Sequence, residues 1–397
     1  MEPNQSTTPL RRGAFLKDVL ICSLGSYGGP ETHISVFIDQ MVEKKGYVSE
    51  PDLIELVALC SILPGPTSTQ TIVSIGHKMG GPKLALLTML VWALPVLTVM
   101  GALSFIYQFF DAQNISRDVL RFVGPMAVGF IVVAAVRIGR KVVVDAPTAV
   151  LMVASAGVTY LLREPWVFPV LLLAGGLVAL VIGREPGMWN PVKVRPPWRY
   201  LGAFALFALA GLVAASLSDA RVVQLFESFY RYGYLVFGGG QVVVPVMHSE
   251  LVEVRNYLTN GEFLTGYGLV QGLPGPMFSF AAYAGGMAAR GASVWTQVAG
   301  ATVGGIGIFL PGLLLIYFVF PLWEDLKQIR AIRISLKGIN AVAGGLIAVA
   351  AVILTQAAGF APENLIATAA AAGLLAFTKI PAPLIVAAAL AAGIVLR

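Results

Sequence analysis

Two Pro-Gly-Pro motifs, Pro64–Pro66 and Pro274–Pro276, are the features of this sequence that point most directly to chemistry. They lie near the centres of Ser49–His77 and Thr259–Met287, each about as long as one membrane span. Proline removes a backbone amide and clashes with the preceding turn, while glycine adopts backbone angles that other residues avoid. Each motif is therefore expected to end one half-helix and start another. The first amides of the new helix lack intrahelical partners and lie at its positive end, so they can bind an anion.

Hydrogen-bonding groups adjoin both breaks. The residues after the second proline, Thr67–Thr69 and Met277–Ser279, are expected to present free amides, and several of them carry hydroxyls. Gln271 adds a side-chain amide just before the second break. Such uncharged groups suit a tetrahedral oxyanion. The alternative is that the hydroxyls bond to their own helix backbone and the breaks are packing kinks without a ligand.

Gly-rich motifs, Gly28–Pro30 and Gly238–Gly240, close an apolar run in each half of the chain. They are interpreted either as ordinary helix ends or as second broken elements packed against the Pro-Gly-Pro breaks. His33 and Gln241 follow them, and His33 could carry a proton near neutral pH. The predicted substrate-binding residues are Gly28, Gly29, Pro30, His33, Pro64, Gly65, Pro66, Thr67, Ser68, Gly238, Gly239, Gly240, Gln241, Gln271, Pro274, Gly275, Pro276 and Ser279.

Three acids are candidates for coupling or gating. Glu31 follows the first Gly-rich motif, and Glu43 and Glu253 occupy matching places in the two halves. An ionisable group at membrane depth is a functional hypothesis by default. The competing interpretation places these acids on a solvated or interfacial face. The two cysteines and three histidines are isolated, so neither a disulfide framework nor a metal site is expected, and no motif indicates an enzyme or a cofactor.

The composition indicates that most of the protein surface faces a lipid bilayer. The chain of 397 residues is 57% hydrophobic and only 12% charged, and its mean hydropathy is +0.80. Its apolar runs lack the two-residue alternation of barrel strands, so the expected fold is an all-α polytopic membrane protein. The runs are Lys83–Phe110, Phe122–Val136, Ala146–Leu162, Trp166–Ile182, Leu201–Leu217, Val294–Phe320, Ile339–Leu354 and Pro381–Leu396.

An internal repeat organises these runs. Gly28 and Gly238 are 210 positions apart, and so are Pro64 and Pro274. Aligning residues 28–76 with 238–286 without gaps gives 12 identities in 49 positions. We therefore expect an N-terminal transport repeat (14–182), a basic linker with an extra transmembrane helix (183–220) and a C-terminal transport repeat (221–397). About 13 spans would result, and the extra span would turn the second repeat over relative to the first, as in many secondary transporters.

Basic residues predict the orientation. Clusters near Arg12, Lys78, Arg140, Arg195 and Lys337 fall on one side if there are 13 spans, so the positive-inside rule places that side and the N-terminus in the cytoplasm. The net charge of +6 is thereby accounted for without a nucleic-acid partner. The start, residues 1–8, lacks the apolar core and cleavage site of a signal peptide, so the first span is expected to be retained. The expected location is the inner (cytoplasmic) membrane.

At these motifs the chain resembles the chromate ion transporter family in its long, two-domain form. The resemblance rests on Gly28–Pro30 with His33, on Pro64–Pro66, on Phe237–Gln241, and on Gln271–Pro276 followed by Phe280–Tyr283. Tyr27 and the pair Glu31–Thr32 depart from the family pattern, and an acid at position 31 could repel an anion.

The resemblance implies secondary active export of chromate, a divalent tetrahedral oxyanion, by alternating access, with chromate resistance as the consequence. Proton coupling and a homodimer are further expectations. A transporter of sulfate or another anion, or an anion channel with the same helix-end site, are the alternatives.

Overall fold

The computed structural model describes residues 11–112, 116–185, 188–189, 195–237 and 240–396. Its first half comprises α1 (Arg12–Gly25), α2 (Pro30–Phe37), η1 (Ile38–Lys44), α3 (Glu50–Ser61), α4 (Thr67–Ala112), α5 (Ser116–Val119), α6 (Val123–Val142), α7 (Ala146–Leu162), α8 (Val167–Ile182) and α9 (Trp198–Leu217). Its second half comprises α10 (Arg221–Leu235), η2 (Gly240–Val242), α11 (Val243–His248), η3 (Ser249–Val254), α12 (Asn260–Gln271), η4 (Met277–Ser279), α13 (Phe280–Ala288), α14 (Val294–Val319), η5 (Phe320–Leu322), α15 (Trp323–Leu326), α16 (Arg330–Ala358), α17 (Pro362–Phe377) and α18 (Ala382–Val395).

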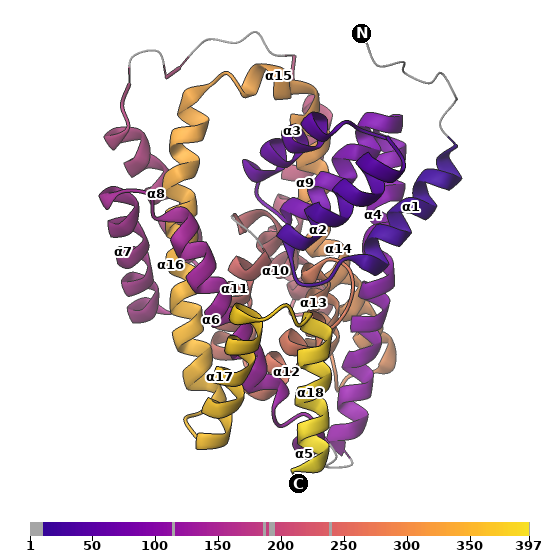
Figure 1. Ribbon diagram of the computed structural model, residues 1–397, viewed down its shortest axis with the longest axis vertical. Coiled ribbons are helices and arrows are strands. Elements are labelled where there is room, and N and C mark those ends of the chain that lie inside the picture. Colours follow the sequence, from indigo (N-terminus) through magenta and orange to yellow (C-terminus); the bar gives the residue numbers. More distant parts are fainter. Residues whose placement is uncertain (1–10, 113–115, 186–187, 190–194, 238–239, 397) are drawn as a thin grey trace.

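The expected all-helical membrane architecture is confirmed. Five described segments are long and apolar enough to cross a membrane: Thr67–Phe110, Val123–Val142, Trp198–Leu217, Val294–Leu326 and Arg330–Ala358. Four shorter apolar helices, α7, α8, α17 and α18, add to them. The predicted count of about 13 spans stays a prediction, because α1, α2, α3 and α10–α13 are short pieces separated by breaks (Figure 1).

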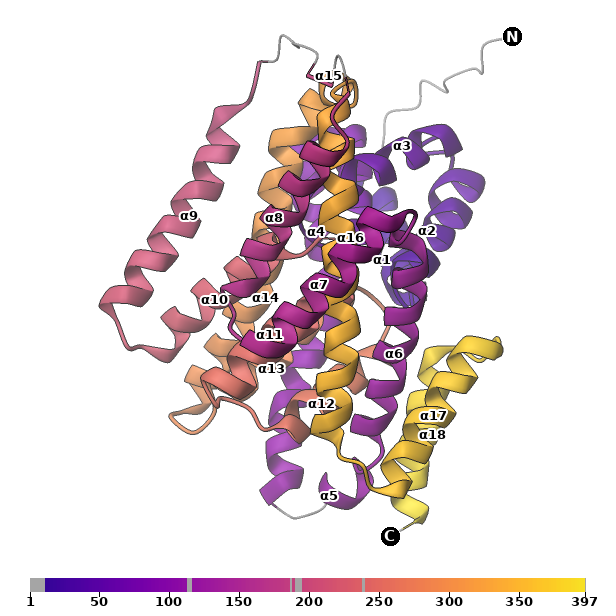
Figure 2. The same cartoon turned by 90° about the vertical axis from the view of Figure 1, so that its left-hand side faces the viewer.

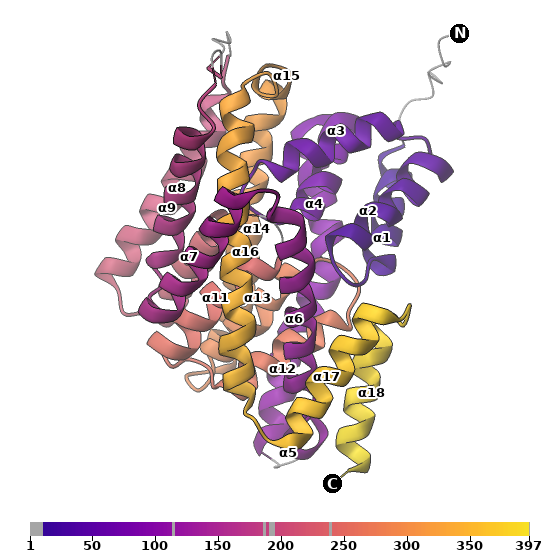
Figure 3. The ribbon, with the colours of Figure 1, turned by 60° about the vertical axis from the view of Figure 1, so that its left-hand side comes forward.

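The long helix α16 occupies the centre of one side of the bundle, where it packs against α6, α7 and α8 (Figure 3). Small residues allow the backbones to approach closely, which is the usual way that helices pack in lipid. A Cβ atom on Gly338 of α16 would overlap the carbonyl of Gly175 of α8. By contrast, α9 lies along the outer edge of the bundle, and only 6% of its apolar window is buried (Figure 2). The core that positions the breaks is therefore built without α9.

Helix caps and π-helices repeat at the same 210-residue offset as the sequence motifs. Ser49 and Asp52 form a capping box at the start of α3, and Thr259 and Glu262 form one at the start of α12. Both pairs differ by 210 positions. The π-helices η1 and η3 precede these caps at matching places. The two motif regions thus share backbone structure as well as sequence.

Candidate functional site at the paired helix breaks

Each Pro-Gly-Pro motif separates two helices, as the sequence predicts. Helix α3 ends at Ser61 and α4 begins at Thr67, and the second break lies between α12 and the turn η4 that leads into α13. The central glycines have positive φ angles, +120° at Gly65 and +108° at Gly275. Only glycine adopts these φ angles at little cost, so the backbone of each break depends on glycine at its central position.

The residues just before each Gly-rich motif lie against the Pro-Gly-Pro break of the opposite half. The amide of Gly65 donates to the carbonyl of Val236 at 2.7 Å, and the amide of Gly275 donates to the carbonyl of Ser26 at 2.7 Å. These two bonds are equivalent under the 210-residue offset. The breaks and the Gly-rich segments are therefore joined into one crossed arrangement. The predicted binding residues Gly238 and Gly239 lie outside the described residues, and so do the side chains of Pro30 and Glu31.

A small closed cavity lies where the two breaks meet. Its volume is about 20 Å³, which has room for about one water molecule. Such a space is too small for a tetrahedral oxyanion. The cavity is lined by Gly29, His33, Pro66, Thr67, Ser68, Thr69, Pro276, Met277 and Phe278.

His33 is the buried polar side chain of this cavity with an open hydrogen-bonding position. It is 2% exposed. Its Nδ1 atom lies 3.0 Å from the hydroxyl of Ser68, while its Nε2 atom is buried without a partner among the described residues. Trp92 packs edge-on against the imidazole, with ring centroids 5.5 Å apart, and donates through Nε1 to the Thr69 hydroxyl at 3.0 Å. A buried unpaired nitrogen is costly, so water or a ligand is expected to satisfy it.

The two helix starts differ in how many amides they offer. At the first break α4 begins directly at Thr67, so its first-turn amides have no intrahelical partners. At the second break the amide of Ser279 donates to the carbonyl of Pro276 at 2.9 Å. The expectation that Ser279 presents a free amide is therefore wrong, because a 3₁₀ turn precedes α13 and uses that amide. The hydroxyl of Ser279 is buried without a partner among the described residues. The Gln271 side chain donates to the sulfur of Met277 at 3.3 Å.

A larger cleft of about 490 Å³ adjoins the closed cavity, and Thr67 and Ser68 line both. Two further predicted residues, Gln241 and Gln271, line the cleft beside Gly28. The cleft therefore reaches the first break directly, and from the second half it is lined by glutamines that flank the motifs.

Three cations line this cleft and were missed as site residues in the sequence: Arg137 and Lys141 from α6, and Lys337 from α16. The sequence assigned them only to basic connections between spans. The signal that could have revealed them is the spacing of Arg137 and Lys141, which places both on one face of α6. The described lining contains no acidic side chain.

The cleft cations are held at its rim by contacts with neighbouring elements. Arg137 donates to the carbonyl of Leu375 at 2.8 Å. Lys337 pairs with Asp145 at 2.5 Å. The ammonium of Lys337, with the Thr148 side chain and amide, lowers the pKa of Asp145 to about 2, so this carboxylate is ionised at physiological pH. A dianion in the cleft would compete with Asp145 for Lys337.

The proposed coupling acids Glu43 and Glu253 line neither the closed cavity nor the cleft. Glu43 is exposed on η1. Glu253 lies 3.6 Å from Arg163 and 3.9 Å from His248, in a separate small cavity.

Three other carboxylates among the described residues are buried: Asp18 at 2% exposure, Glu250 at 3% and Glu262 at 7%. Glu262 belongs to the capping box of α12 and pairs with Arg290 at 2.7 Å. Asp18 accepts from Gln40 at 2.8 Å, and Glu250 accepts from Ser228 at 2.9 Å. Under the 210-residue offset, Asp18 corresponds to Ser228 and Gln40 to Glu250. In the first half the carboxylate is on the earlier residue of the contact, and in the second half it is on the later residue. A search for acids at matching positions of the two repeats therefore did not find these two.

Replacing Glu250 with glutamine is expected to lower the free energy of unfolding by about 3 kcal/mol. Glu250 accepts hydrogen bonds from Arg231 and Arg255, each with a contact of 2.9 Å. Its loss leaves the partly buried Arg255 without an anion, while Arg231 keeps Glu227 at 2.7 Å. The thermal unfolding midpoint of the purified protein measures the effect. The exposed Glu43→Gln is the control and should leave the midpoint unchanged, while an unchanged midpoint in Glu250→Gln would contradict the assignment.

A family model described as chromate transporter matches residues 14–180 and 223–394. The chain is 27% identical over 364 residues to the chromate transport protein of Pseudomonas aeruginosa, covering 89% of this chain and 82% of that protein. It is 27% identical over 378 residues to the chromate transport protein of Cupriavidus metallidurans, covering 93% and 89%. An uncharacterized transporter of Bacillus subtilis is 28% identical over 183 residues, which is 44% of this chain but 97% of that protein. No solved structure matches the chain.

Proposed function

The chain belongs to the chromate transporter family, a family of membrane transporters and not of enzymes, and on that premise we propose that it exports chromate across the cytoplasmic membrane by alternating access. The observation that carries the proposal is the first helix start, Thr67–Ser68, which adjoins a cleft lined by three cations and no described acid. Helix amides and cations together are the groups that bind oxyanions in proteins. A tetrahedral dianion suits this combination better than a neutral or cationic substrate.

We infer that the repeats 14–182 and 221–397 have inverted topology and are joined by the linker and extra helix at 183–220. The crossed bonds of Gly65 and Gly275 support a two-fold relation, since they are equivalent at the repeat offset. Helix α3 lies toward the upper end of Figure 1 and α12 toward the lower end, the arrangement of an inverted pair. The half-length bacterial relative supports the division, because one repeat has the length of a whole protein. Rocking of one repeat against the other would open the closed cavity.

The charges of the cleft support the proposed direction of transport. Arg137, Lys141 and Lys337 belong to the basic clusters that the positive-inside rule assigns to the cytoplasm. The cleft would then face the cytoplasm with the N-terminus on the same side, and it would concentrate dianions before they enter. Loading from the cytoplasm corresponds to export, which would protect the cell from chromate.

Replacing His33 with leucine is expected to raise the half-saturating chromate concentration by about tenfold or more. The physical reason is the loss of a buried donor to a charged ligand, worth about 1.5–3 kcal/mol. Uptake into proteoliposomes at graded chromate concentrations measures the change. The control His77→Leu alters a half-buried histidine of the same helix bundle that lines neither space. If His33→Leu took up chromate with wild-type affinity, His33 would not be a substrate-binding residue.

The proposed function is tested by chromate flux in proteoliposomes of the purified protein under an imposed pH or potential gradient. Accumulation against a chromate gradient, abolished when the proton gradient collapses, is expected for a proton-coupled transporter. Flux that only dissipates a chromate gradient would instead indicate the anion channel. Competition by excess unlabelled sulfate tests the other alternative. A sulfate transporter would prefer sulfate to chromate, so its chromate flux would fall.

A further inference from the structure

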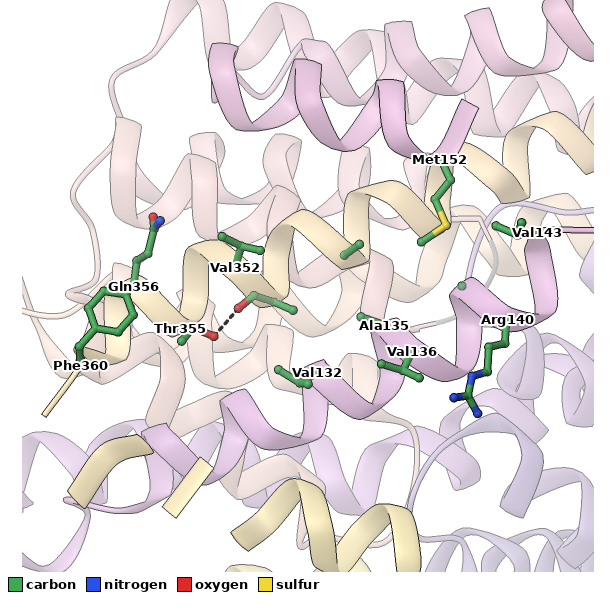
Figure 4. A pocket seen from close by; sticks show the side chains of 13 residues that line it. Val132, Ala135, Val136, Arg140, Val143, Met152, Val352, Thr355, Gln356 and Phe360 are labelled. Atoms are coloured by element: carbon green, nitrogen blue, oxygen red, sulfur yellow. Dashed lines mark hydrogen bonds between the residues drawn. The ribbon is translucent and has the colours of Figure 1, made fainter. Parts of the chain in front are cut away.

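An open apolar groove of about 930 Å³ lies on the outside of the bundle between α6 and α16, with Met152 of α7 along one side (Figure 4). It is separate from the cleft described above. On α6 the groove is lined by Val132, Val136 and Arg140, whereas the cleft is lined by Ala134 and Lys141 among others. These sets lie on different faces of the helix, since residues four apart share a face and residues two apart do not. Helix α6 is therefore a wall between the two spaces.

The groove exposes apolar side chains along its length. Val136 and Val352 are each 49% exposed and Phe360 is 66% exposed. The hydroxyl of Thr355 is used within its own helix, donating to the carbonyl of Ala351 at 2.6 Å, so it leaves the groove surface apolar (Figure 4). An occupant of this surface must have an apolar body.

Arg140 is the one cation among the described lining residues of the groove. It lies at one end in Figure 4, and Gln356 and Phe360 lie at the other. At the end opposite Arg140, Arg163 donates to Gln356 at 3.4 Å, but Arg163 is paired with Glu253. Arg140 is exposed, and no acidic side chain in the described part of the chain forms an ion pair with it. The arrangement fits an amphiphile that has an anionic head at Arg140 and an apolar tail along the helices. Arginine pairs with phosphate oxygens through two parallel hydrogen bonds.

The size of the groove matches one leaflet of the bilayer. The α6 wall from Val132 to Arg140 rises about 12 Å at about 1.5 Å per residue. Half of a hydrocarbon core is about 15 Å thick. Arg140 belongs to the basic cluster at the end of α6, which is where the head groups of a leaflet would lie.

We propose that this groove is a binding site for one anionic phospholipid, with its phosphate at Arg140 and an acyl chain between α6 and α16. Charge complementarity at one end and apolar surface along the rest identify the occupant. The site rests on the protein being a membrane protein and not on its substrate, so lipid binding is independent of chromate transport.

The test measures retained lipid on the full-length protein by native mass spectrometry. The protein is equilibrated with phosphatidylglycerol or phosphatidylcholine in detergent, and wild type is compared with Arg140→Gln and Ala348→Phe, which fills the groove. Arg333→Gln removes an exposed cation of α16 outside the groove and is the matched control.

We expect wild type and Arg333→Gln to retain phosphatidylglycerol at least several-fold more than phosphatidylcholine. Arg140→Gln should lose this preference, and Ala348→Phe should lose both lipids. Equal retention of phosphatidylglycerol by wild type and Arg140→Gln would overturn the head-group assignment. Unchanged retention in Ala348→Phe would overturn the groove itself. Because no readout involves transport, a protein that fails to carry chromate can still pass or fail this test.

Discussion

Replacing Gly65 or Gly275 with leucine is expected to abolish chromate export while the protein still inserts and reaches wild-type levels in the membrane. Both glycines have positive φ angles, which cost a residue with a side chain about 1–3 kcal/mol. A Cβ atom at Gly65 would lie 2.9 Å from the Gln70 side-chain nitrogen, and one at Gly275 would lie 2.9 Å from Val96. The substitution therefore displaces the break and weakens the bond that ties it to the opposite half. Chromate export from cells, or chromate uptake into inverted vesicles, measures the effect.

The matched control for these variants is Gly291→Ala. Gly291 also has a positive φ, +94°, but a Cβ atom there meets nothing within 4 Å and the residue is in a connection away from the breaks. It reproduces the backbone strain without altering the site, so its export should stay near wild type. Normal export in both Gly65→Leu and Gly275→Leu would refute the role of the breaks.

Neutralising the cleft cations is expected to weaken chromate uptake through the loss of charge. Arg137→Gln should raise the half-saturating chromate concentration about three- to tenfold, since charged clefts concentrate counter-ions and speed their entry. Asp145→Asn should lower it, because it frees Lys337 from its 2.5 Å ion pair. The pKa of Asp145 is lowered to about 2, so its carboxylate is charged throughout the neutral range and its own titration adds no pH dependence to the gain between about pH 5 and 8. Initial uptake rates at graded chromate concentrations measure both changes.

Salt and position distinguish this charge effect from damage to the fold. The differences between wild type and the charge variants should shrink as ionic strength rises to about 0.15 M, where the screening length is about 8 Å. Arg333→Gln, on α16 but outside the cleft, should behave as wild type. If Arg137→Gln and Asp145→Asn shifted affinity in the same direction, the cleft would not act through its charge.

The helix breaks could be predicted from sequence because their cause is local. Proline restricts the backbone and removes an amide wherever it occurs, and glycine permits angles that other residues avoid. Pro64–Pro66 and Pro274–Pro276 therefore predicted the ends of α3 and α12 correctly. The repeat was visible for the same reason, since it depends only on spacing. Partners across the molecule were not predictable, and the contact of Gly65 with Val236 in the other half is one example.

The cleft and the buried acids depended on packing that spacing does not encode. Arg137 and Lys337 become one lining only because α6 and α16 meet, which no single segment of sequence indicates. Glu43 and Glu253 matched in sequence, yet the two most deeply buried carboxylates among the described residues are Asp18 and Glu250, which do not match each other. The second break also departs from the first. Met277 and Phe278 stand where the first half has Thr67 and Ser68, and a 3₁₀ turn there uses the amide of Ser279.

The lining of the closed cavity also differs between the two halves. The cavity has room for about one water, is lined by residues of both breaks, and adjoins the cleft at Thr67 and Ser68. The first half supplies the helix start, the histidine and the adjoining hydroxyls, and the second half supplies mainly apolar surface at Met277 and Phe278. We expect substrate to be held chiefly by the first break, while the second moves to admit and release it.

Equilibrium binding of radiolabelled chromate to the purified protein tests the central claim, that the paired breaks form one oxyanion site, most directly. Wild type and Gly291→Ala should show saturable binding to one site, weakened by His33→Leu and lost in Gly65→Leu and in Gly275→Leu. Loss in both glycine variants is the decisive result, because each glycine belongs to a different repeat. Saturable chromate binding of wild-type affinity in either of them would contradict the account.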